Sequence, residues 1–193
     1  MACDESCFVG SIVGLAVGDA LGYPAEFRRR SQLLAEIGPD GITDFIALKD
    51  PRFSRPHFAG SGHPPGTYTD DTQMTIAVAE GILAAADQDL DGVMAAIAAR
   101  FVEWSRSEDN NRAPGGTCMD GCANLSSGVH WRTAGVANSK GCGSAMRVAP
   151  FGLFYSDLDQ VEEMARCSSL LTHGHSAALE GAAAAALMVA LAL

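Results

Sequence analysis

Basic residues, aromatic residues and alternating apolar patterns are all scarce in this sequence. Lysine and arginine together number 13 against 23 aspartates and glutamates, which gives a formal net charge of −10. This balance argues against binding to a DNA or RNA backbone, which requires clustered basic side chains. Aromatic residues make up only 7% of a chain that is 48% hydrophobic. We therefore expect a core built mainly from alanine, leucine, valine and isoleucine.

A secretory leader and a membrane anchor are not expected either. The first residues, MACDES, are acidic, and glycines interrupt the apolar run that follows. We therefore expect a cytoplasmic protein whose six cysteines are free thiols. The pairs Cys3/Cys7 and Cys118/Cys122 share a four-residue offset that could suggest zinc, but no other signal supports such a site.

No convincing strand pattern is present, and the sequence predicts five helices within one domain spanning 1–193. They run from about Ser6 to Leu21, Thr69 to Leu83, Asp91 to Arg106, Leu158 to Leu170, and Ser176 to the last residue. Segments 50–68 and 107–147 are rich in glycine or proline and are expected to be long ordered loops, which are often functional. The predicted fold class is all-α.

Two of the expected helices carry further information. Gly10, Gly14 and Gly18 recur at steps of four, which favours close packing of another backbone against that face. The last helix is apolar all round, a pattern typical of the middle of a larger core, and it is too short to span a bilayer. We therefore expect the chain to be the front part of a longer protein, incomplete at its C-terminus.

The triplet Thr69, Asp70 and Asp71 stands directly before an apolar helix. Helix capping explains much of it, because threonine is a good N-cap and aspartate in the first turn suits the helix dipole. One aspartate would suffice for capping, and two adjacent carboxylates repel each other. A divalent cation removes this repulsion, and three hard oxygen ligands suit Mg²⁺. Both interpretations stay open at this point.

A second acidic cluster imitates the start of an EF-hand calcium loop. Asp87, Asp89, Asp91 and Gly92 have the required spacing, but the twelfth position is Ala98 where a bidentate glutamate is needed. We interpret this cluster as an acidic connection between two helices.

Five segments, taken together and in this order, resemble the ADP-ribosylglycohydrolase family, the dinitrogenase-reductase-activating type of ADP-ribosyl hydrolase. They are GSIVGLAVGDALGYPAEF at 10–27, GTYTDDTQMTIAVAEGIL at 66–83, GTCMDG at 116–121, GCGSAMRVAPFGL at 141–153 and LTHGHSAALEGAAAAAL at 171–187. The resemblance covers essentially the whole chain. It implies an all-α, orthogonal multi-helix domain with a two-magnesium centre at the base of a cleft that takes ADP-ribose.

The resemblance also implies residue roles. Thr69, Asp70 and Asp71 match metal ligands, and Glu26 and Asp120 match acidic residues of the catalytic region. The substrate-binding residues that it implies are Ser139, Lys140, Gly141, Cys142, Gly143, Ser144 and His173. Three positions depart from the family pattern: Met119 and Gly121 beside Asp120, and Cys142 where an asparagine is usual. The later D-x-D-T motif, which completes the metal site in relatives, is missing here.

The function implied is an Mg²⁺-dependent hydrolase that cleaves the glycosidic bond between ADP-ribose and a protein side chain or small acceptor. Its partners would be ADP-ribosylated proteins or small ADP-ribose conjugates, with no nucleic-acid backbone and no membrane. The alternative is a non-catalytic ADP-ribose-binding or crystallin-like structural relative, or an inactive fragment.

Each candidate residue also has a plainer interpretation. Glu26 could form a surface salt bridge with the arginines that follow it, and Asp120 could stabilise a turn in a glycine-rich stretch. His173 and His175 could cap helix ends. The glycine loop at 141–144 could be the ordinary start of a helix.

Overall fold

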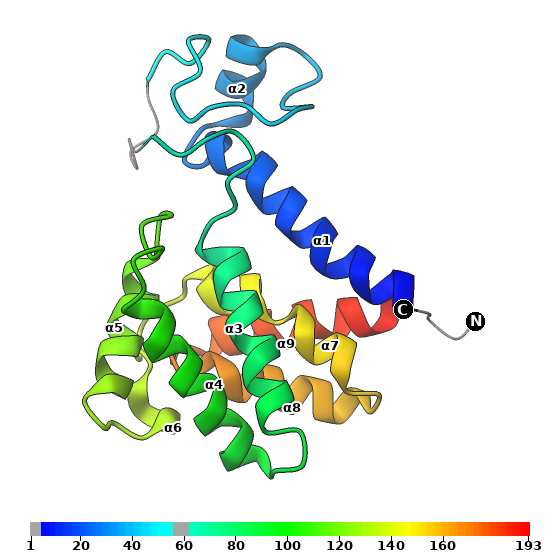
Figure 1. Ribbon diagram of the computed structural model, residues 1–193, viewed down its shortest axis with the longest axis vertical. Coiled ribbons are helices and arrows are strands. Elements are labelled where there is room, and N and C mark those ends of the chain that lie inside the picture. The colour runs from blue at the N-terminus through cyan, green and yellow to red at the C-terminus, as the bar shows by residue number, and fades with distance from the viewer. Residues whose placement is uncertain (1–4, 56–61) are drawn as a thin grey trace.

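The structure, a computed structural model, describes residues 5–55 and 62–193. Within these ranges the chain is helical and has no strand, apart from an isolated parallel bridge between Val136 and His173. Figure 1 shows a body formed by the helices from α3 onward, from which α1 rises towards a smaller lobe around α2. The all-α prediction is confirmed.

The five expected helices are all present, within a few residues of their expected bounds. They are α1 (Glu5–Gly22), α3 (Asp70–Ala84), α4 (Leu90–Ser105), α8 (Leu158–Ser169) and α9 (Ser176–Ala192). The other elements are α2 (Arg30–Ile37), α5 (Gly116–Ser126), α6 (Trp131–Ala134) and α7 (Ala149–Phe154), with 3₁₀ turns at Tyr23–Ala25 and Cys142–Arg147.

The prediction of one long loop over 107–147 is wrong, because α5, α6 and the second 3₁₀ turn lie inside it. Helix α5 buries Cys118, Gly121 and Cys122. These residues are small, so they form a packing face that a search for large apolar side chains does not detect. Burial raises the pKa of Cys118 to about 11 and that of Cys122 to about 12, so both thiols stay protonated in the core.

The acidic connection that resembles an EF-hand belongs to the start of α4. The side chain of Asp89 caps this helix by accepting a hydrogen bond from Gly92 N. Asp91 accepts hydrogen bonds from the side chains of Trp131 and Arg132 on α6. The two carboxylates therefore have structural partners, as the interpretation of a helix connection requires.

Helices α3 and α4 pack closely at a glycine. A Cβ atom on Gly81 would lie 2.7 Å from Ile97 Cγ1 and 2.8 Å from Ile97 Cα, nearer than side chains approach. Around this contact the core is fully enclosed, with Val78, Met94 and Phe101 all inaccessible to solvent. The pair α3–α4 therefore forms a rigid base, and the candidate site lies at the N-terminal end of α3.

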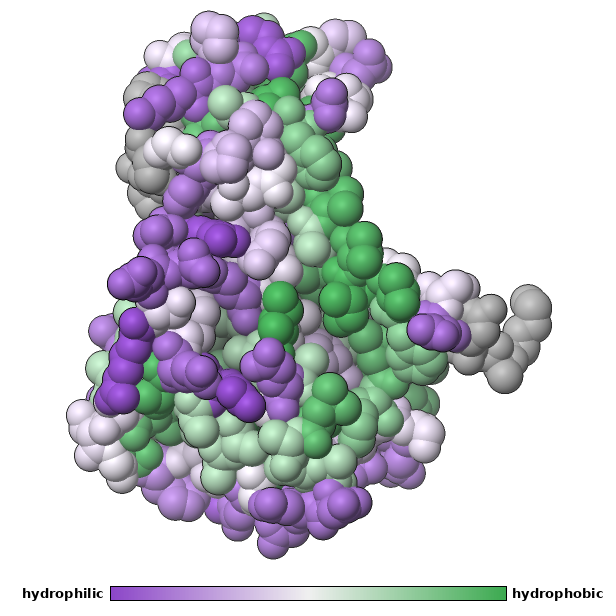
Figure 2. All heavy atoms as spheres, viewed as in Figure 1, coloured by the Kyte–Doolittle hydropathy of each residue, from purple (hydrophilic) through white to green (hydrophobic). Residues whose placement is uncertain are grey.

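Helix α1 differs from the expectation of tight packing. No atom lies within 4 Å of a Cβ built on Gly10, Gly14 or Gly18, so this prediction is wrong for the part of the chain that the structure describes. Val13 is 54% exposed, and Figure 2 shows a hydrophobic band along this helix. By length and composition alone, the stretch Glu5–Ala25 is apolar enough to cross a membrane. The absence of a membrane anchor therefore stays a prediction.

Helix α9 is only partly enclosed by the residues that the structure describes. Its alanines at 178, 182, 183 and 186 are buried in the body. Near its end, Met188 is 73% and Leu191 is 71% exposed. Figure 1 shows this end of the chain close to the start of α1. Both helices therefore present exposed apolar side chains.

Candidate active site

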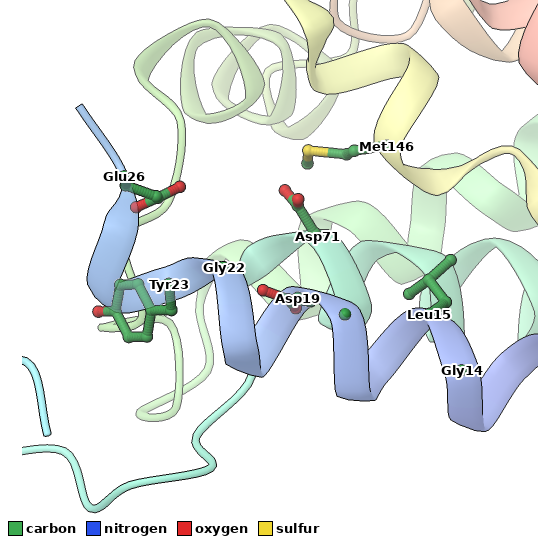
Figure 3. Close-up of a pocket in the computed structure, with 9 residues that line it drawn as sticks. Gly14, Leu15, Asp19, Gly22, Tyr23, Glu26, Asp71 and Met146 are labelled. Carbon is green, nitrogen blue, oxygen red and sulfur yellow. The ribbon is translucent and has the colours of Figure 1, made fainter. Parts of the chain in front are cut away.

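A cavity of about 360 Å³ lies between α1 and the beginning of α3. Asp19, Glu26 and Asp71 line it together with Tyr23, Met146 and the small residues of α1, and no lysine or arginine is among its lining residues. Figure 3 shows Glu26 and Asp71 facing the same space from opposite sides, with Met146 above them. The cavity is therefore acidic, in accordance with the net charge of the chain.

The side chain of Asp19 binds the first turn of α3, which lies 50 residues later in the chain. Its Oδ2 accepts hydrogen bonds from Thr69 N (2.8 Å), Thr72 N (3.2 Å) and Thr72 Oγ1 (2.6 Å), and its Oδ1 accepts one from Thr69 Oγ1 (2.7 Å). The backbone N–H groups at a helix start have no partner within the helix, so an acceptor from another element satisfies them. Asp19 thereby fixes α1 to the end of α3 that carries Thr69, Asp70 and Asp71.

The triplet itself combines capping with exposure to the cavity. Thr69 caps α3, because its hydroxyl oxygen accepts a hydrogen bond from Asp71 N, so the capping interpretation is confirmed for this residue. Asp70 is buried, and its Oδ2 accepts a hydrogen bond from Gly115 N at 2.9 Å, just before α5. Asp71 is half-buried and lines the cavity. Capping therefore accounts for Thr69 but not for Asp71.

The pKa values of these acids are raised by crowding in a partly dry space. Burial, followed by the charges of Asp71, Asp70 and Asp19, raises the pKa of Glu26 to about 7. Burial and the charges of Asp70 and Asp19 raise the pKa of Asp71 to about 7, and burial raises that of Asp70 to about 6. Carboxylates whose charges are this unfavourable gain stability from a neighbouring cation.

The donor set fits Mg²⁺ in chemistry. Carboxylate oxygens are the ligands this ion prefers, and it commonly binds through one or two carboxylates while keeping several waters. Asp71 supplies such oxygens at the wall of the cavity, Asp70 stands beside it in the first turn of α3, and the hydroxyl of Thr69 is already bonded to Asp19. Among residues 5–55 and 62–193, no three histidine, cysteine or acidic side chains are grouped closely enough to hold a metal ion by themselves.

The two carboxylates matched to the catalytic region occupy different environments. Glu26 lines the cavity, whereas Asp120 is exposed on α5 and is not among the lining residues. Asp120 lies within a helix, so the interpretation of a turn residue is wrong. Arg28 forms its ion pair with Glu36, at 3.6 Å. The charges that act on the pKa of Glu26 come instead from the aspartates of the cavity.

The departure from the family pattern at Gly121 has a steric reason. A Cβ atom there would lie 2.6 Å from both Leu171 O and Thr172 Cα. Glycine therefore lets α5 approach the segment that carries Thr172 and His173. In this way the helix that bears Asp120 packs directly against the region of the predicted substrate-binding histidine.

The predicted substrate loop leads into the second 3₁₀ turn, whose N-cap is Gly141. This agrees with the interpretation of the glycine loop as the start of a helix. Lys140, Gly141 and Cys142 are exposed, Ser139 and Gly143 are half-buried, and Ser144 is buried. The hydroxyl groups of Ser139 and Thr117 lie within hydrogen-bonding distance, at 3.1 Å, so the loop contacts the first turn of α5. Its exposed backbone offers N–H groups without requiring a basic patch.

His173 and His175 have different positions. His175 caps α9 by accepting a hydrogen bond from Ala177 N, which confirms the capping interpretation for this residue. His173 is only 2% exposed, and its ring lies against the loop at Gly141 and Gly143. It therefore supports the loop from beneath.

Comparison with known proteins places this arrangement in a family. The sequence profile of ADP-ribosylglycohydrolase matches residues 4–193. The chain belongs to the ADP-ribosylglycohydrolase family. Proteins of this family are the source of the resemblance noted in the sequence, and their profile extends over the cavity, the substrate loop and α9 alike.

Individual relatives agree with this assignment. The chain is 38% identical to a protein of Archaeoglobus fulgidus over 96% of its own length and 55% of the relative. It is 34% identical to ADP-ribosylhydrolase ARH3 of Gallus gallus over 96% of the chain and 50% of the relative. A solved structure titled ADP-ribosylglycohydrolase-related protein complex superposes with a TM-score of 0.58 at 27% identity, covering 92% of this chain and 53% of that one. The chain spans about half the length of these relatives.

Two residues of this ADP-ribosylglycohydrolase region were not singled out from the sequence. Asp19 holds Thr69 and Thr72, and Arg147 is fully buried behind the substrate loop. Asp19 lies in the G-D-x-x-G segment already quoted for the resemblance, so that motif could have pointed to it. Arg147 directly follows the loop, but nothing in the sequence distinguishes a buried arginine from an exposed one.

Proposed function

We propose that this chain carries the carboxylate centre and the diphosphate loop of an Mg²⁺-dependent hydrolase, which releases ADP-ribose from a protein side chain or a small acceptor. The observation that carries the proposal is the acidic cavity: Asp19, Glu26 and Asp71 line one space that contains no lysine or arginine. Membership in the ADP-ribosylglycohydrolase family supports the same reaction class. The implied location is the cytoplasm.

The chain's own residues have separate tasks in this proposal. Asp71 and Asp70 would hold the cation, and Asp19 keeps them in place through the first turn of α3. Bound Mg²⁺ would position the ribose hydroxyls and polarise a water molecule, as a template and Lewis acid. Glu26 lies across the cavity from Asp71 and would take the proton of the attacking water as general base. The backbone N–H groups of Cys142 and Gly143, at the start of the second 3₁₀ turn, would donate to the diphosphate.

The position of Glu26 distinguishes it from Asp120 as the candidate base. Hydrolysis of an ADP-ribosyl bond passes through an oxocarbenium-like centre at the anomeric carbon, next to the attacking water. A general base has to reach that water directly or through one other water molecule. Glu26 lines the acidic cavity and Asp120 does not, so we assign the role of general base to Glu26.

The metal assignment is tested by titrating Mg²⁺ into the protein in a calorimeter. The double variant Asp70→Asn and Asp71→Asn is expected to weaken Mg²⁺ binding at least tenfold, about 1.4 kcal/mol. The control carries Asp87→Asn and Asp159→Asn, which remove two exposed carboxylates outside the cavity. Unchanged Mg²⁺ affinity in the first double variant would show that these aspartates do not bind the metal.

A second titration with ADP-ribose, followed by a release assay on ADP-ribosylated arginine and serine peptides, separates the enzyme from a binding protein. We expect release to require Mg²⁺ and to be lost in Glu26→Gln while ADP-ribose binding remains. Binding without any release by the wild type would favour the non-catalytic alternative. That alternative draws on one observation, namely that no group of three potential metal ligands occurs within the described ranges.

A further inference from the structure

Arg147 is a buried charge without a carboxylate partner among the described residues. It is 0% exposed, and its guanidinium donates hydrogen bonds to Gly143 O (2.8 Å), Ser168 O (3.1 Å) and Thr172 Oγ1 (2.7 Å). Its Nε has no hydrogen-bond partner. Burying an arginine in this way costs free energy, so a role beyond filling space is expected.

The hydrogen bonds of Thr172 determine which ring nitrogen of His173 carries a proton. A guanidinium can only donate, so the hydroxyl oxygen of Thr172 is an acceptor towards Arg147. The same oxygen lies 2.8 Å from His173 Nδ1. Thr172 has one hydroxyl proton and is fully buried, and among the described residues His173 Nδ1 is the one acceptor within hydrogen-bonding distance of its hydroxyl. The hydroxyl therefore donates to Nδ1, which leaves the proton of the neutral imidazole on Nε2.

The other protonation states are less favourable. If His173 Nδ1 carried the proton and donated to Thr172, the buried hydroxyl proton would have no acceptor, at a cost of one buried hydrogen bond. A doubly protonated ring would place a second positive charge beside Arg147 within the core. Burial and the charge of Arg147 together lower the pKa of His173 to about 4, in agreement with a neutral ring.

The Nε2 side of the ring faces the substrate loop. A Cβ atom on Gly141 would lie 3.1 Å from Nε2, and one on Gly143 would lie 2.8 Å from Cε1 of the same ring. A side chain at Gly143 would collide with the ring and one at Gly141 would press against it, so the two glycines keep the ring close to the loop backbone. No hydrogen-bond partner of Nε2 occurs in the described ranges, which leaves this N–H available to a ligand at the loop.

Resting on the proposed function, we propose that Arg147 and Thr172 are positioning residues for diphosphate recognition. They hold His173 as the neutral tautomer with its proton on Nε2, so that Nε2–H and the N–H groups of Cys142 and Gly143, at the start of the 3₁₀ turn, donate to the same anionic ligand. Arg147 also places a positive charge directly behind the loop by binding Gly143 O. The buried charge of Arg147 thereby adds to the attraction of the loop for a diphosphate in a chain whose net charge is −10.

The tautomer is tested by nuclear magnetic resonance on protein with ¹⁵N-labelled histidine and no ligand. Long-range ¹H–¹⁵N spectra distinguish a protonated from an unprotonated ring nitrogen, and His173→Gln identifies the signals of this residue among the five histidines. We expect a protonated Nε2 in the wild type and in Thr172→Ser, which keeps the hydroxyl. In Thr172→Val, which removes the hydroxyl with little change of shape, we expect a mixture of tautomers.

Calorimetry with ADP-ribose completes the test. We expect Thr172→Val to weaken ADP-ribose binding about tenfold while Thr172→Ser stays within about twofold of the wild type, with circular dichroism confirming that both variants fold. A proton on Nδ1 in the wild type would overturn the inference whether or not ADP-ribose binds. Equal affinities in the wild type and Thr172→Val would refute the part concerning the ligand. A wild type with the expected tautomer but no ADP-ribose binding would refute the proposed function and leave the tautomer assignment standing.

Discussion

The carboxylate of Asp19 accepts four hydrogen bonds from the first turn of α3, two from backbone N–H groups and two from threonine hydroxyls. Thr69 and Thr72 are each only 2% exposed, so water cannot replace these bonds if the carboxylate is lost. At the scale of single residues, this makes Asp19 a support of the candidate site as well as a lining residue of its cavity.

Asp19→Ala is therefore expected to lower the free energy of unfolding by about 2–4 kcal/mol, because several buried donors lose their acceptor together. Asp89→Ala is the matched control, since this aspartate caps α4 through one hydrogen bond to Gly92 N, and its loss should cost only about 1 kcal/mol. Urea unfolding in the presence of a chelator measures both variants without a contribution from metal. Equal losses would contradict the role given to Asp19.

At the scale of helices, glycine has two opposite roles in this chain. At Gly81 it permits the contact between α3 and α4, where the backbone of Ile97 leaves no space for a methyl group. On α1 the glycines meet no neighbour in the described ranges; Gly14 and Gly18 leave space in the candidate cavity, whereas Gly10 only weakens the helix. The sequence shows both kinds as isolated glycines inside helical patterns.

This difference predicts opposite effects of one substitution. Gly81→Ala should destabilise the protein by about 1–3 kcal/mol, because the added methyl group forces α3 and α4 apart. Gly10→Ala should be neutral or stabilise by up to about 1 kcal/mol, because alanine is the better helix former and the space beside it is open. Thermal unfolding of the two variants and the wild type measures these changes in stability. A loss of stability in Gly10→Ala would contradict the prediction, because it would show that another segment packs against α1 at this position.

At the scale of the whole molecule, exposed apolar residues are concentrated on α1 and at the end of α9. Val9, Val13 and Val17 on α1 and Met188 and Leu191 on α9 are all exposed, and Figure 2 shows the band that follows α1 onto the body. Large contiguous apolar patches on a protein surface promote association. The strong negative charge of the chain opposes this tendency, most of all at low ionic strength.

The isolated 193-residue chain is therefore expected to associate with increasing concentration, more strongly at high salt than at low salt. Val13→Glu combined with Leu191→Glu should shift the protein towards the monomer in sedimentation velocity. The pair Ala95→Glu and Ala123→Glu adds the same charge at exposed alanines elsewhere and controls for repulsion alone. A wild type that stays monomeric over the whole concentration range would contradict the prediction.

Long periodic segments were predictable because their local pattern and their packing agree. Helix α4 was predicted from the helical spacing of four apolar residues, Val93, Ile97, Phe101 and Trp104, and all four are buried. Helix α5 was not predicted from the sequence, because small residues form its packing face. Its close approach to Thr172 depends on Gly121, whose importance appears only when the two segments are in contact.

By itself, the sequence determined the helical class, the five long helices and the family, because periodicity and ordered motifs are properties of neighbouring residues. Only the tertiary structure decided which carboxylates share a cavity, that Asp19 reaches across 50 residues to the head of α3, and that Arg147 is buried behind the loop. Burial, pKa and the direction of a hydroxyl proton depend on residues distant in the chain, which come together only when the helices pack.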